Sequence, residues 1–288
     1  MQLNKDRELE LYFLCMFYLI IYWAGLMFYE TLEMSFVYSG LLFFNRHYST
    51  RRPRTFPTVS GKQIIQDKEV ISTIVGSLLG DASVHTQNKR GVNTSFSFAQ
   101  SVIHVEYLLY LWEFFSSRGI TSPVPPVVKE LYNKSLNKTY YYMRFRTYTF
   151  PEFNFIRDMF YINKTYNEND VTVTKRVKIV PSNIGYYLNP LALAIWYMDD
   201  GSKKPHRESG ILIHTSGFTY EDNVFLCKVL KNNFNLDVIT SVDKYSEDGT
   251  PYYKLYVLAH SIPLFKQIIE PYVRRVPSMM YKLNDKTN

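Results

Sequence analysis

Two apolar segments, far apart in the chain, each end on an aspartate beside a small residue. Residues 74–82 read IVGSLLGDA, and residues 192–201 read ALAIWYMDDG. Both patterns predict apolar helices that end near Asp81, Asp199 and Asp200. A helix carries partial negative charge at its C-terminus, so a carboxylate there costs roughly 0.3 to 1 kcal/mol. Two such helices packed side by side would bring like charges together, which a divalent cation could neutralise, and that arrangement suits metal-assisted phosphodiester hydrolysis.

The first segment also carries two glycines, Gly76 and Gly80, at helical spacing. Residues four apart lie on the same face of a helix, and each internal glycine costs about 1 kcal/mol relative to alanine. The pair predicts that a second backbone approaches this face closely. The alternative is an ordinary core helix in which the glycines have no special role.

The elements expected around these two segments largely repeat in order. The first set comprises a helix at 69–81, strands at 82–85 and 94–101, a helix at 103–117, strands at 127–132 and 139–148, and a helix at 151–161. The second set comprises a helix from Pro190 to Gly201, a strand at 210–216, a helix at 219–234, strands at 236–243 and 251–259, and a helix at 261–272. A tandem repeat with one catalytic carboxylate in each half predicts pseudo-two-fold symmetry and one composite site.

The predicted fold class is therefore α+β, with two pseudo-symmetric αββαββα repeats. We divide the chain into a hydrophobic and then basic extension with its linker (1–60), a first repeat (61–162), a mostly polar linker (163–188) and a second repeat (189–288).

Charge and composition favour an anionic partner. The formal net charge is +7, and 17% of the residues are aromatic, with residues 140–146 (YYYMRFR) mixing both properties. Arg144 and Arg146 are two apart and share one face of their strand, where they could contact phosphate or guanine or simply be solvated. Cys15 and Cys227 are too few for a disulfide framework or a thiolate zinc site.

The N-terminal extension leaves several interpretations open. Residues 11–29 carry no charge over 19 residues, close to the roughly 20 that span a bilayer. They could form a membrane anchor, a dispensable leader or a buried helix. Residues 46–54 (RHYSTRRPR) are typical of a linker, and a targeting segment or a nucleic-acid-contacting arm is the alternative.

The two aspartate-terminated segments resemble the signature of the LAGLIDADG homing endonucleases. The resemblance is to the single-chain, two-motif type encoded in organellar (mitochondrial) group I introns, and it extends from about residue 70 to residue 284. The second motif, with its lead-in LNPLALA, is the more specific, and PSMMYKL at 277–283 also resembles the ending of yeast mitochondrial members.

The resemblance implies a set of site residues. The metal-binding aspartates fall on Asp81 and Asp200, which would hold Mg2+, while Asp199 falls at a helix-interface position. Matching the family's K-x-x-P and Y-K-L segments places catalytic lysines at Lys178 and Lys282. Two sheets would form a saddle over the DNA major groove. The candidate DNA contacts are Gln100, Ser101, Arg144, Arg146, Thr215 and Ser216, of which the two polar pairs end strands in corresponding positions of the two halves.

The function implied is that of a monomeric, mitochondrial, site-specific endonuclease that cuts double-stranded DNA and so promotes intron mobility. The main alternative is a maturase that binds its group I intron RNA and assists splicing. A third hypothesis, a membrane protein whose remaining part is vestigial, rests only on residues 11–29.

Overall fold

The computed structural model describes residues 59–86, 93–168, 171–203 and 210–283. All of them belong to one compact unit, residues 54–288. The predictions for residues 1–58, and the polar turn expected at 89–91, lie outside the described residues. Within the described ranges, none of the helices combines the length and apolar character needed to cross a bilayer.

The first half of this unit builds a four-stranded antiparallel sheet in the order β1-β2-β4-β3. Its core side includes Phe98, which stacks on Phe145 and packs against Phe115 of the covering helix α4. The elements of this first half are α2 (Gly61–Gln66), α3 (Lys68–Leu79), β1 (Ser83–Thr86), β2 (Thr94–Ser101), α4 (Val105–Ser116), β3 (Val128–Asn133), β4 (Lys138–Arg146) and α5 (Asn154–Phe160).

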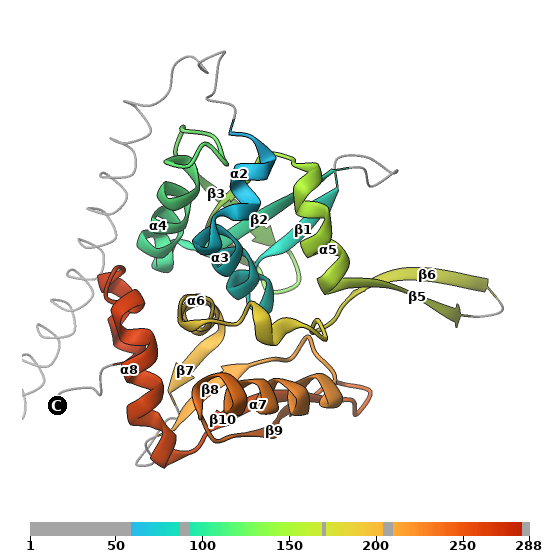
Figure 1. The fold of residues 1–288 in the computed structure, drawn as a ribbon. Coiled ribbons are helices and arrows are strands. Elements are labelled where there is room, and N and C mark those ends of the chain that lie inside the picture. Colours follow the sequence, from blue (N-terminus) through green and yellow to red (C-terminus); the bar gives the residue numbers. More distant parts are fainter. Residues whose placement is uncertain (1–58, 87–92, 169–170, 204–209, 284–288) are drawn as a thin grey trace, which may run out of the picture. The chain divides into compact units, whose positions relative to one another are not determined.

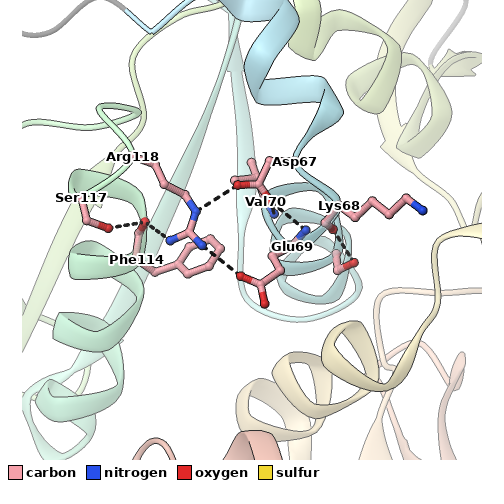
Figure 2. Close-up of polar contacts among 8 residues, drawn as sticks. Asp67, Lys68, Glu69, Val70, Phe114, Ser117 and Arg118 are labelled. Atoms are coloured by element: carbon pink, nitrogen blue, oxygen red, sulfur yellow. Dashed lines mark hydrogen bonds and ion pairs between the residues drawn. The ribbon is translucent and has the colours of Figure 1, made fainter.

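The start of α3 is fixed by charged side chains. Asp67 caps the helix by accepting hydrogen bonds from the backbone amides of Glu69 and Val70. Arg118, just beyond the end of α4, donates to Asp67 at 3.1 Å and to Glu69 at 2.9 Å, and its guanidinium lies over the ring of Phe114 (Figure 2). These contacts tie the beginning of α3 to the end of α4.

The second half repeats the sheet order of the first, as β7-β8-β10-β9 (Figure 1). Because the order β1-β2-β4-β3 has the same pattern, the structure confirms the predicted mixture of helices with antiparallel sheets in two related halves. The elements are α6 (Pro190–Asp200), β7 (Gly201–Lys203), β8 (Ile211–His214), α7 (Tyr220–Phe234), β9 (Val238–Tyr245), β10 (Pro251–Val257), α8 (Ile262–Val273) and a final 3-10 segment, η5 (Pro277–Lys282).

The connection between the halves differs from the polar linker expected from the sequence. It forms an antiparallel two-stranded sheet of its own, β5 (Tyr161–Glu168) and β6 (Val171–Lys178). Its Thr, Val and Tyr residues have high strand propensity, although their polar neighbours obscure the alternation of apolar and polar residues that is typical of a strand. The helix expected to run through residue 161 ends at Phe160 for the same reason. The short strand β7 was also not expected.

Candidate active site

The site is built on the contact between α3 and α6. A Cβ atom on Gly76 would lie 2.4 Å from the carbonyl oxygen of Ala192 and 2.9 Å from Cβ of Ile195. A Cβ atom on Gly80 would lie 2.5 Å from Cβ of Asp199. The prediction that a second backbone approaches these glycines is therefore confirmed, because only glycine leaves room for α6 at this distance.

Polar contacts fix the position of α6 along the axis of α3. Asn189 caps α6 by accepting from the backbone amide of Ala192 at 3.0 Å. The same side chain donates to the hydroxyl of Ser72 on α3 at 2.6 Å. The first turn of α6 is thereby held against α3, and the C-terminal ends of the two helices are brought level.

Three carboxylates meet at these C-terminal ends. Asp81 follows α3 and is exposed, while Asp199 and Asp200 end α6 and are partly buried. Asp199 accepts from the backbone amide of Asp81 at 3.4 Å. Gln100, at the end of β2, donates to the Asp81 carboxylate at 2.8 Å and to that of Asp199 at 3.4 Å. The structure therefore brings both predicted metal ligands to one place and positions Asp199 at the helix interface.

The electrostatics of this cluster disfavour its negative charge. Burial, and next the charge of Asp81, raises the pKa of Asp200 from 3.8 to about 7. Burial, and then the charges of Asp81 and Asp200, raises the pKa of Asp199 well above its ordinary value. A cation placed between the carboxylates would offset both effects, because an opposite charge favours the ionised form.

Each helix end also receives one lysine. Lys282 is buried, and its ammonium group donates to the carbonyl oxygens of Met198 at 2.5 Å, Asp199 at 3.2 Å and Tyr197 at 3.4 Å. Lys178 donates to the carbonyl oxygen of Gly80 at 3.1 Å. Both lysines cap the last turn of a helix that ends on aspartate, where positive charge is favourable.

The lysines are held near the carboxylates at the cost of desolvation. Burial lowers the pKa of Lys178 and of Lys282, and the three nearby aspartates oppose that shift. Their catalytic role stays a prediction, but both lie near enough to Asp199 and Asp200 to feel the charges of these aspartates.

The donor set fits a divalent cation that prefers oxygen ligands. Asp81 and Asp200 offer two carboxylates, one from each half, and Gln100 orients the first of them. In the part of the chain that the structure describes, no group of three or more His, Cys, Asp or Glu residues forms a ready-made metal cage. Magnesium commonly binds through one or two carboxylates and takes its other ligands from water and phosphate.

The predicted DNA contacts of the first sheet lie in two places. Arg144 and Arg146 are exposed on one face of β4, whereas the intervening Phe145 is buried on the other. Ser101 is exposed at the end of β2, and Gln100 faces the carboxylates instead of that exposed side.

The equivalent pair in the second half is different. Thr215 is 2% exposed, and its hydroxyl group contacts the side chain of Asn223 at 2.5 Å and the carbonyl oxygen of Tyr253 at 3.1 Å. The structure therefore contradicts the expectation that Thr215 faces DNA, because its hydroxyl holds α7 to the sheet. Ser216 is partly buried in the turn that follows β8.

A polar cluster in the second sheet was missed by the sequence reasoning. His214 hydrogen-bonds the hydroxyl of Ser202 at 2.9 Å and contacts Asp243 at 3.3 Å, while Lys254 pairs with Asp243 at 3.0 Å. These four residues come from four strands, β7, β8, β9 and β10. The pairing of strands was needed to bring them together.

The fold and the site define a protein with two related halves, each supplying a helix and an aspartate to one shared acidic centre. The profile of the LAGLIDADG DNA endonuclease family matches residues 71–265, and the chain belongs to this family.

Relatives of two kinds share its sequence. The chain is 32% identical over 216 residues to the cytochrome b mRNA maturase bI2 of Saccharomyces cerevisiae, a match that covers 75% of this chain and 47% of the yeast protein. It thus spans about half the length of that relative. It is 31% identical over 216 residues to the DNA endonuclease I-ChuI of Chlamydomonas applanata, covering 74% of this chain and 93% of that protein.

A solved structure shares the fold. The homing endonuclease I-WcaI, bound to its DNA recognition sequence, superposes with a TM-score of 0.62 at 23% identity. The match covers 81% of this chain and 96% of the other. The two-sheet architecture predicted from the sequence is therefore that of a known homing endonuclease.

Proposed function

We propose that this protein is a site-specific endonuclease that cuts double-stranded DNA and promotes the mobility of its intron. The observation that carries the proposal is the meeting of Asp81 and Asp200, one from each half, at the ends of two helices in direct contact. A single site built from both halves needs no second copy of the chain, so we infer that the protein acts as a monomer. The similarity to a cytochrome b mRNA maturase supports a mitochondrial location.

Asp81 and Asp200 are the residues that would hold Mg2+. When bound there, the ion would acidify the attacking water and stabilise charge on the leaving oxygen. Gln100 holds the Asp81 carboxylate in a fixed orientation through its 2.8 Å hydrogen bond. Lys178 and Lys282 keep positive charge at the helix ends, where the scissile phosphate would lie.

The exposed face of the first sheet would bind the substrate. Arg144 and Arg146 project from one face of β4, where guanidinium groups can hold phosphates or pair with guanine edges. Ser101 lies at the edge of this surface. Phosphate contacts position the duplex, and base contacts give the sequence preference.

The proposal is tested by incubating the full-length protein with DNA that spans the intron-lacking version of its host gene. Cleavage at one place in Mg2+, and none in EDTA, is expected. Asp81→Asn should abolish cleavage while leaving DNA binding intact, because it removes one metal ligand. Asp158→Asn, a change at an exposed residue of α5, is the matched control and should cut normally. Cleavage by the Asp81→Asn variant would remove this aspartate from the mechanism.

A second candidate function is that of a maturase, which the 32% identity to the cytochrome b mRNA maturase bI2 favours. In that role the basic surface would bind the group I intron RNA and the aspartates would be dispensable. The Asp81→Asn variant separates the two functions, because splicing assistance should survive a change that stops DNA cleavage.

A further inference from the structure

The β5–β6 ribbon, residues 161–168 and 171–178, belongs to neither four-stranded sheet. Among the strands that the structure describes, these two pair only with each other, through eight residue pairs from Tyr161 opposite Lys178 to Glu168 opposite Val171. Figure 1 shows the ribbon extending beyond the helices and sheets. An isolated two-stranded ribbon is marginally stable in water, so one that extends in this way gains from a binding partner.

The two faces of the ribbon differ in chemistry. The strand register places Asn163 opposite Arg176 and Thr165 opposite Thr174 on what we call the polar face. All four of these residues are exposed. The opposite face carries the apolar and long side chains, namely Ile162, Lys164, Tyr166, Val173, Lys175 and Val177. Beyond Tyr161 at its base, the polar face therefore offers amide, hydroxyl and guanidinium groups without apolar interruption.

The polar face adjoins the catalytic centre and the first sheet. Lys178, at the base of the ribbon, reaches the end of α3. Arg176 donates to the backbone carbonyl of Val84 in β1 at 3.4 Å and lies over the ring of Tyr161. The pKa of His85, next to Val84, is lowered by burial first and then by Arg146, Arg144 and Arg176, so the positive charges of both surfaces act on one region.

We propose that the polar face of the β5–β6 ribbon lies in the major groove of the DNA beside the cleavage site, as a third DNA-binding surface. This inference rests on the proposed endonuclease function. The major groove admits a two-stranded ribbon, and Asn, Thr and Arg are residues that read base edges there. Eight residues per strand extend about 27 Å, which corresponds to about eight base pairs.

Two adjacent substitutions test the proposal. Thr174→Glu places a carboxylate on the polar face, and Val173→Glu places one on the opposite face of the same strand. Both replace a β-branched residue with glutamate and change the net charge equally. Binding of each full-length variant to a duplex carrying the wild-type cleavage site is measured by fluorescence anisotropy in EDTA. Thr174→Glu should weaken binding about tenfold or more, because a base contact contributes about 1 to 3 kcal/mol, whereas Val173→Glu should bind nearly as wild type.

A footprint gives an independent readout. Wild type and Val173→Glu should protect a flank of about eight base pairs that Thr174→Glu leaves open. A second pair on the partner strand, Thr165→Glu against Tyr166→Glu, repeats the comparison if one variant misfolds by circular dichroism.

The outcomes distinguish this inference from the proposed function. Equal binding and equal footprints for the two faces, with a wild type that binds and cuts, would overturn the ribbon proposal alone. A wild type that binds no DNA would overturn both proposals.

Discussion

Replacing Gly76 with alanine should destabilise the protein, although alanine is the better helix former. The new methyl group would lie 2.4 Å from the carbonyl oxygen of Ala192, whereas ordinary contact begins at 3.4 Å. The helices would have to separate by about 1 Å, because the obstacle is backbone and not the end of a flexible side chain. Overpacking of this kind costs about 1 to 3 kcal/mol.

The helix propensity of alanine offsets about 1 kcal/mol of that cost. We take the upper end of the overpacking range because Ala192 and Ile195 are fully buried and have no space into which to move. The net loss is then about 2 kcal/mol, equivalent to a fall in Tm of about 4 to 8 °C for a protein of this size.

Thermal and urea denaturation of Gly76→Ala would measure this loss. Gly217→Ala is the matched control, because a methyl group there would meet nothing within 4 Å. Cleavage should fall together with stability, since Asp81 and Asp200 are held at the ends of the separated helices. A Gly76→Ala variant as stable as Gly217→Ala would refute the argument that close backbone contact determines this interface.

Three further predictions concern charges around the two helices. Lys282→Met should lower the free energy of unfolding by about 1 to 3 kcal/mol, because buried carbonyl groups lose their donor, whereas the exposed Lys231→Met should change denaturation little. The raised pKa of Asp200, about 7 against 3.8, means that the folded chain holds this proton more tightly than the unfolded chain. In EDTA this group's contribution to stability should therefore decline as pH rises from about 4 to about 7, and urea titrations of Asp200→Asn should lack that component. Arg118→Met should cost at most about 1 kcal/mol in the same assay, because its ion pairs are partly exposed.

The periodicity of apolar residues along single helices and strands was sufficient to predict the central features of the fold. The helix ending near Asp81, the start of α6 at Pro190 and the strand from Thr94 to Ser101 follow from local pattern and capping. The glycine spacing on α3 also predicted close packing, because two internal glycines are costly unless they admit a neighbour.

The sequence pattern did not predict features that depend on contacts between residues far apart in the chain. The three residues of β7 form a strand only because β8 pairs with them. Thr215 is a small polar residue at the end of a predicted strand, which is typical of an exposed position. In the structure its hydroxyl bonds to Asn223 on α7. A lysine's position in the sequence does not specify which group its ammonium reaches, so the capping of α6 by Lys282 appears only in three dimensions.

The placement of the lysines links the stability of the fold to the chemistry of the site. The end of α6 presents carbonyl groups that lack an amide donor within the helix, each with partial negative charge, together with two carboxylates. Lys282 binds the carbonyl groups directly, and Lys178 does the same for Gly80 at the end of α3. Both helix ends can therefore hold their aspartates close together before any cation or phosphate arrives. The carboxylates of Asp81 and Asp200 remain available because the lysines bind backbone oxygens in place of forming ion pairs with them.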